Sequence, residues 1–105
     1  MVAPPSLADS SWLGACTHGA VGTYTFRFGP ETTGAGRVQV EVPDMPGAPH
    51  DVPYRATTAA DGTSQLEIDL NPTWRGQFTR DQGGLVWSFT IDRSPIVHTC
   101  QLTSP

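Results

Sequence analysis

The residues of this chain that could do chemistry lie in two short segments that mirror each other. Near its beginning the chain reads Cys16-Thr17-His18, and near its end it reads His98-Thr99-Cys100. Together they hold both cysteines and two of the three histidines of the 105-residue chain. Residues two apart on a β-strand share a face. If both segments are strands, each of them presents one thiol and one imidazole on the same face.

An antiparallel pairing of these two strands brings the four side chains together. A step forward along one strand is a step backward along its partner, so a register that opposes Cys16 to Cys100 also opposes His18 to His98. The first interpretation is a Cys16–Cys100 disulfide beside a histidine pair. Such a bridge encloses most of the chain, and the loop-entropy account gives it about 4–5 kcal/mol of stabilisation.

The second interpretation is a metal site in which Cys16, His18, His98 and Cys100 bind one ion. Two thiolates and two imidazoles suit tetrahedral zinc, or another transition metal such as Cu(I) or iron. The spacing is not that of a zinc finger, and four protein ligands would close the coordination shell, which makes the metal structural. The sequence therefore predicts either no cofactor or, as the alternative to the disulfide, zinc or another transition metal.

Composition favours a β domain and excludes several classes of function. The chain has 11 glycines and 10 prolines, which is typical of frequent turns. All six basic residues are arginines, which excludes Schiff-base chemistry and a phosphate-loop lysine. The net charge of −4 argues against a nucleic-acid partner, because phosphate binding needs a basic face. No apolar run approaches the roughly 18 residues that cross a bilayer, so we expect no membrane partner.

Alternating apolar and polar residues predict strands separated by short, turn-forming connections. The predicted strands are residues 10–18, 22–29, 37–42, 51–57, 63–70, 73–80, 85–92 and 95–103. An even number of strands makes the first and last antiparallel, as the mirrored segments require, and closure leaves no exposed edge. We therefore predict an all-β fold: an eight-stranded antiparallel up-and-down barrel over residues 10–105, with first and last strands paired, after a disordered lead at 1–9.

Proline within one predicted strand complicates this barrel. Pro53 cannot donate a ladder hydrogen bond, so we expect the sheet to be open or bulged there. Elsewhere the apolar neighbours of the mirrored segments assign them to the inner face. Cys16 and His18 share a face with Trp12 and Gly14. His98 and Cys100 share one with Ile96 and Leu102.

The up-and-down order also predicts that the three histidines gather at one mouth of the barrel. His18 ends the first strand, His98 begins the last, and the loop at 43–50 that holds His50 lies at the same end. Inward aromatic rings beside a few polar groups are typical of a ligand pocket, although such rings can also fill a small barrel. The predicted ligand-binding residues are His18, His98, Tyr24, Tyr54, Trp74, Trp12 and Trp87.

Trp12, Gly14, the meander and the inward aromatic residues resemble the calycin group, which comprises lipocalins, avidins and fatty-acid-binding proteins. The opening of the chain is similar to the G-x-W region of lipocalins and avidins, with Ser10 in place of the glycine. The chain is shorter than most members and lacks the C-terminal helix of lipocalins. The resemblance implies the architecture of nearly the whole chain and assigns no ligand residue. Small bacterial protease inhibitors with a barrel and one disulfide are a second likeness.

Three functions from different classes follow. The first is binding of a small apolar or aromatic molecule at the mouth that carries His18, His98 and the 43–50 loop. The second is an enzyme at the same mouth, either metal-dependent or a cyclase or isomerase with histidine or tyrosine as acid and base, with no catalytic residue assigned. The third is a secreted protein-binding or protease-inhibitor domain that uses residues 4–9 or the 43–50 loop as its contact.

Localisation depends on the redox state of the cysteines. The first six residues hold no signal-peptide core, and the segment Ala3-Pro4-Pro5-Ser6 is similar to the beginning of a mature secreted protein. Disulfides persist in oxidising compartments. We therefore expect a secreted, periplasmic or extracellular protein, or a cytoplasmic one if the cysteines are reduced.

Overall fold

The computed structural model describes residues 7–18, 21–43, 49–58, 60–70, 72–81 and 84–104. These residues form eight strands: β1 (Ser11–Cys16), β2 (Tyr24–Thr32), β3 (Ala35–Glu41), β4 (His50–Thr58), β5 (Ser64–Ile68), β6 (Trp74–Asp81), β7 (Gly84–Ile91) and β8 (Val97–Thr103). No helix long and apolar enough to cross a membrane occurs in this part of the chain.

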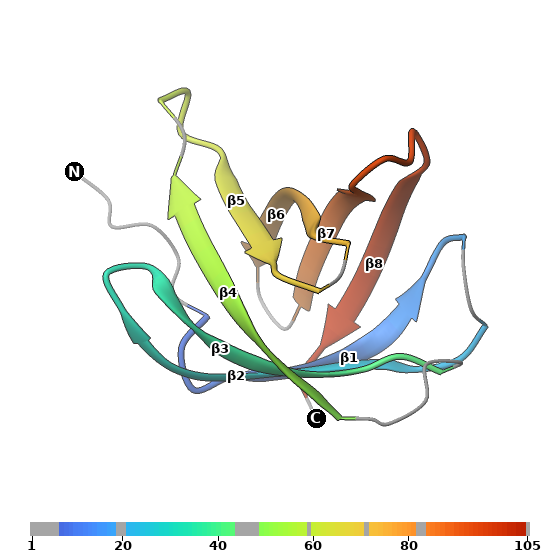
Figure 1. Ribbon diagram of the computed structural model, residues 1–105, viewed down its shortest axis with the longest axis horizontal. Helices are drawn as coiled ribbons and strands as arrows, with labels where there is room; N and C mark the ends of the chain where they lie inside the picture. Colours follow the sequence, from blue (N-terminus) through green and yellow to red (C-terminus); the bar gives the residue numbers. More distant parts are fainter. Residues whose placement is uncertain are drawn as a thin grey trace.

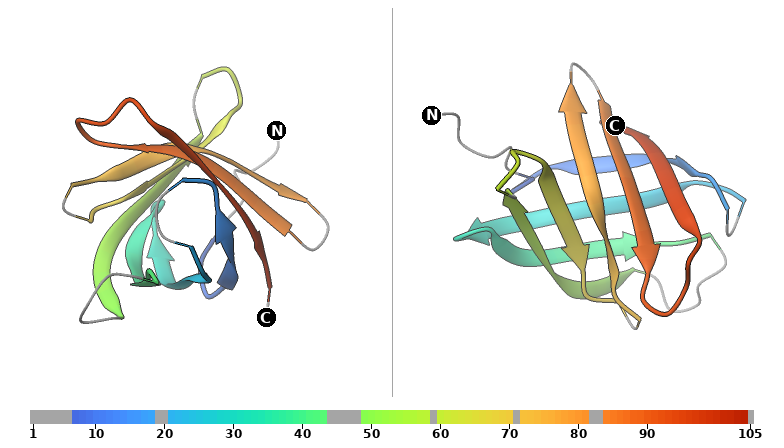
Figure 2. Two further views of the ribbon diagram at one scale, coloured as in Figure 1. Left: turned by 90° about the vertical axis from the view of Figure 1, so that its right-hand side faces the viewer. Right: turned by 90° about the horizontal axis from the view of Figure 1, so that it is seen from above.

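Every strand pairs antiparallel with its neighbours in the chain, and β1 pairs with β8 to close the barrel (Figures 1 and 2). This confirms the predicted fold class, including the pairing of the first and last strands. Connections after β1, β3, β5 and β7 lie at one end of such a meander. We call this the histidine end, because His18 follows β1 there and His98 lies near the start of β8.

The barrel forms because its strands alternate between an apolar and a polar face. In β3, for example, Val38 and Val40 are fully buried while Arg37 and Gln39 are exposed. The inward side chains of all eight strands make one continuous hydrophobic cluster, in which Phe26, Trp87 and Phe89 are among the largest members. Burial of this cluster is the main force that closes the sheet.

A disulfide between Cys16 and Cys100 joins the two strands that close the barrel. The register of β1 and β8 opposes these residues directly, as the mirrored segments predict, and continues through Gly14 and Leu102. The bonded residues are 84 positions apart in the chain. The bridge therefore holds the first strand to the last beside the histidine end.

Gly14 allows β1 and β8 to approach each other beside this bridge. It occupies an inward position opposite Leu102, and a β-carbon added there would collide with the Gln101 carbonyl and the Leu102 backbone. Only a residue without a side chain fits this close approach.

Pro53 interrupts only one of the two ladders of β4. On the β3 side the ladder continues through the Arg37–Pro53 pair, whereas the β4–β5 ladder ends at Tyr54 and Ile68. The Asp69 amide donates to the Pro53 carbonyl at 2.9 Å, so the backbone groups of Pro53 face β5. The amide N–H that proline lacks would therefore point towards β5, where the β4–β5 ladder ends. The bulge in the sheet lies instead between Phe28 and Glu31 of β2.

The chain enters the barrel through a short packed segment. Leu7 is fully buried in the core, the Ser10 hydroxyl donates to its carbonyl at 2.6 Å, and the Asp9 amide donates to the Gly29 carbonyl at 3.1 Å. Residues 1–6 of the predicted disordered lead lie outside the described residues.

Candidate functional site

His18 and His98 remain neighbours at the histidine end, but His18 does not face the interior. The ladder extends one residue beyond β1, where the Thr17 amide donates to the Thr99 carbonyl at 2.9 Å. At His18 the backbone then turns to a φ of 61°, which directs the chain out of the ladder. The predicted inward position of His18 is therefore wrong, because its side chain is exposed. The two imidazole rings still lie edge to face, with centroids 6.0 Å apart.

Beneath this pair, stacked aromatic rings lead into the core. His98 is half-buried and stacks on Phe89, with centroids 5.2 Å apart and planes within 13°, because the β7–β8 register opposes the two residues. Phe89 in turn stacks on Trp74 at 4.9 Å. We call His18, His98, Phe89 and Trp74 the ring series, since they connect the surface of the histidine end to the buried core.

Apolar side chains are exposed at the same end. Val21, in the connection after β1, is 98% exposed, and Ile96, in the connection after β7, is 49% exposed. Both connections lie at the right of Figure 1. The predicted inward position of Ile96 is wrong, because β8 begins only at Val97. Val21 and Ile96 thus place exposed apolar area at the same end of the barrel as His98.

Most of the other predicted ligand residues fill the interior. Tyr24, Trp74 and Trp87 are buried in the core cluster. Trp12 is also buried: its indole N–H donates to the Ser10 hydroxyl at 2.8 Å, and the Arg80 guanidinium lies 5.3 Å from its ring centroid. Because β1 begins and β6 ends at the end opposite the histidines, Trp12 lies far along the barrel from the ring series.

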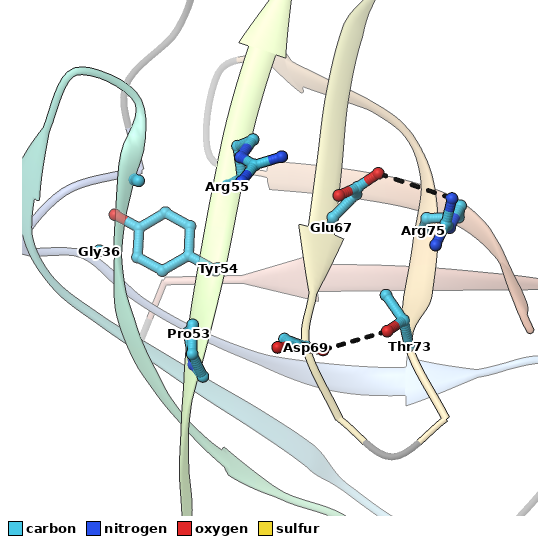
Figure 3. A pocket seen from close by; sticks show the side chains of 9 residues that line it. Gly36, Pro53, Tyr54, Arg55, Glu67, Asp69, Thr73 and Arg75 are labelled. Atoms are coloured by element: carbon cyan, nitrogen blue, oxygen red, sulfur yellow. Dashed lines mark hydrogen bonds and ion pairs between the residues drawn. The ribbon is translucent and has the colours of Figure 1, made fainter.

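Tyr54 is buried against the β2–β3 side of the barrel. Its ring meets Phe28 edge to face at 4.9 Å and crosses the backbone of Gly36 (Figure 3). The hydroxyl is buried and has no hydrogen-bond partner among the described residues. Burial, reinforced by the negative charges of Glu31 and Asp9, raises the pKa of Tyr54 to about 12. The hydroxyl thus stays protonated across the physiological pH range.

His50 begins β4 opposite Val40, and its Nε2 atom is buried without a hydrogen-bond partner in the described part of the chain. Residues 44–48 of the predicted 43–50 lid lie outside the described residues.

The disulfide bears directly on the predicted metal site. Both sulfur atoms are bonded to each other, so neither Cys16 nor Cys100 offers a thiolate to a metal. Among the described residues, no group of three or more histidine, cysteine, aspartate and glutamate side chains is arranged to hold an ion. The bridge is compatible with an oxidising, extracellular or periplasmic location.

An outer pocket of about 300 Å³ crosses strands β3 to β6, and sequence reasoning did not find it. Arg75 lies 3.9 Å from Glu67, and the Thr73 hydroxyl donates to Asp69 at 3.1 Å along its far wall (Figure 3). The sequence did hold one signal for this pocket, namely opposite charges at outward positions of neighbouring strands. Because these groups are exposed and already paired, they define a solvated surface and only weak binding chemistry.

Comparison with known proteins found no match for this chain among protein-family models, curated proteins or solved structures. The closed eight-stranded meander is compatible with a calycin-like architecture. The residues of the histidine end are therefore the best indication of a function.

Proposed function

We propose that this protein is a secreted binding domain that holds a small apolar or aromatic molecule at the histidine end of the barrel. The observation that carries the proposal is the ring series, in which a half-buried imidazole stacks on the rings of the core. A flat ligand placed against His98 and His18 would extend this stack by one member. Offset-stacked and edge-to-face aromatic pairs each contribute about 0.5–1.5 kcal/mol beyond the area they bury.

The surroundings of the ring series suit an apolar ligand. Val21 and Ile96 supply exposed apolar area at the same end, which a bound molecule would remove from water. His18 has a φ of 61°, a conformation that a non-glycine residue adopts at a cost and that is common at ligand sites. Since the interior is occupied by buried side chains, the ligand lies on the rim of the barrel and not deep within it.

Tryptophan fluorescence tests this proposal. Trp74 lies next to Phe89, so a ligand bound against His98 should change the fluorescence emission of Trp74. In a panel of flat aromatic compounds, polycyclic compounds and fatty acids, at least one compound should change this emission in a saturable way. We expect His98→Ala to weaken that binding about two- to tenfold, in line with the loss of a stacking contact. Tyr54→Phe, at the other side of the barrel, should bind as the wild type does. If no compound alters the emission, the proposal fails.

A barrel enzyme at the same end is the alternative proposal, with His18 or His98 as acid or base. The imidazole pair favours it, because histidine is the side chain best suited to proton transfer near neutral pH. Mass spectrometry of each bound compound after incubation would detect turnover. Product that forms with the wild type, and not with a folded His98→Ala variant, would replace the binding proposal by this one.

A further inference from the structure

The outer surface of the barrel is divided into a charged and an uncharged half. Outward positions of β2 to β6 carry Arg27, Arg37, Asp51, Glu67 and Arg75, several of them in ion pairs. The outward positions of β7, β8 and β1 carry no charge. They are Gly84, Val86, Ser88 and Thr90 on β7, Val97, Thr99, Gln101 and Thr103 on β8, and Ser11, Leu13 and Ala15 on β1.

These residues form continuous rows across the strands, which we call the neutral face. One row runs from Val86 through Gln101 to Ala15, as the pairings of β7 with β8 and of β8 with β1 require. In the next row the Ser88 and Thr99 hydroxyls are 3.2 Å apart, and the Thr99 amide donates to the Thr17 hydroxyl at 2.9 Å. Strands β7 and β8 run beside each other, upright in the right panel of Figure 2.

We propose that the neutral face binds a second copy of this chain. In a twofold interface, residues near the axis meet their own counterparts. A charged residue there would oppose a like charge, whereas a glutamine amide or a threonine hydroxyl can both donate and accept a hydrogen bond. Gln101 and Thr99 on the central strand β8 are thus self-complementary. Copies with a net charge of −4 repel each other overall, and a face without charges of its own adds no local repulsion to this.

The shape of the neutral face also favours a second copy of the chain as its partner. Val97 is 54% exposed and Val86 is 37% exposed, so both project from the sheet. Between β1 and β8, a shallow hollow is lined by Ala15, Thr99 and Gln101. A twofold axis near β8 lets the projecting valines of one copy approach the hollow of the other.

The extent of the face sets the expected strength. Three strands about 4.8 Å apart and about six residues of about 3.3 Å each give a projected area of roughly 300 Å² per copy. Stable dimers bury about 800 Å² of accessible surface per partner, so this interface belongs to the weak, reversible class. We therefore expect dissociation constants in the range of about 10 μM to 1 mM.

Sedimentation equilibrium of the disulfide-bonded protein tests the proposal directly, over concentrations from about 10 μM to 1 mM. The mean mass should rise from monomer towards dimer. The decisive variant is Gln101→Glu, which keeps the shape of the side chain but places a negative charge on the central strand. Its dissociation constant should be at least about tenfold higher than that of the wild type, because like charges then meet across the axis.

The matched control is Gln39→Glu, an exposed outward glutamine on β3 that carries the same change on the charged half. It should dimerise as the wild type does. Unchanged dimerisation of Gln101→Glu, or equal weakening by both substitutions, would overturn the proposal. So would a wild-type chain that stays monomeric at every concentration, since the neutral face would then not bind its own copy.

Discussion

At the scale of single residues, the side chains that sequence reasoning grouped together divide into those that reach the surface and those that fill the core. His98 was predicted to face inward, and it does so while remaining half-buried against Phe89. The outward turn at His18 could not be predicted, because a positive φ at a non-glycine residue is set by the local chain geometry and has no sequence pattern of its own here.

Tyr54 gives a pH-dependent prediction at this scale. The pKa of its hydroxyl is about 12 in the folded protein, against the ordinary tyrosine value of 10.0. Between these values the unfolded chain loses the proton and the folded one keeps it, so stability should fall as the pH rises from about 10 to about 12. Denaturant titrations across that range should show the loss in the wild type and not in Tyr54→Phe.

The same variant tests the unpartnered hydroxyl. A buried hydroxyl without a partner costs about 1–3 kcal/mol, so Tyr54→Phe should be neutral or stabilising near neutral pH. Destabilisation by more than about 1 kcal/mol would mean that the hydroxyl has a partner in the folded protein.

Gly14 gives another prediction, since a β-carbon added there would meet the backbone of Gln101 and Leu102. Backbone cannot move aside as a flexible side chain can, so Gly14→Ala should destabilise the fold by about 2 kcal/mol or more. Gly29→Ala is the control, because its nearest neighbour, the Arg37 carbonyl, would lie at an ordinary 3.4 Å. Urea unfolding measures both variants. Equal stability of the two would contradict the close approach of β1 and β8.

At the scale of elements, period-two alternation predicted every strand, because each strand here has one buried and one wet face. Predicted and observed bounds differ mostly by one to three residues, chiefly where turns begin. Ile96 was placed inside because it is apolar, but strand β8 starts one residue later and leaves it in a connection. Leu7 was assigned to the lead because no periodic pattern extends to it. Its burial depends on the tertiary closure of the barrel.

The disulfide that joins β1 to β8 gives the prediction at the scale of elements. A bridge across 84 positions should contribute about 2–5 kcal/mol, so the double variant Cys16→Ala, Cys100→Ala should melt more than about 10 °C lower. Reduction of the wild type should lower its Tm by a similar amount. Under denaturing conditions without reductant, an alkylating reagent should add nothing to the wild-type mass. Uptake of the reagent at both cysteines would contradict the bridge.

At the scale of the whole molecule, the closure of the barrel could be predicted from the mirrored segments. Only one antiparallel register of the first and last strands brings Cys16 opposite Cys100. The same reasoning could not decide whether the barrel encloses a pocket. That depends on how Trp74, Trp87 and Phe89 pack against each other, which is a property of three dimensions. Division of the outer surface into charged and neutral halves likewise emerges only when strands distant in the chain become neighbours.

The central claim is that a ligand binds at the histidine end, and NMR of side-chain nitrogens tests it most directly. Spectra of the histidine imidazoles and tryptophan indoles would be recorded with and without the tightest compound of the fluorescence panel. The account predicts shifts at His18, His98 and Trp74, with the indole signal of Trp12 unchanged because it lies towards the other end of the barrel. Shifts at Trp12 with unchanged signals from His18 and His98 would contradict it.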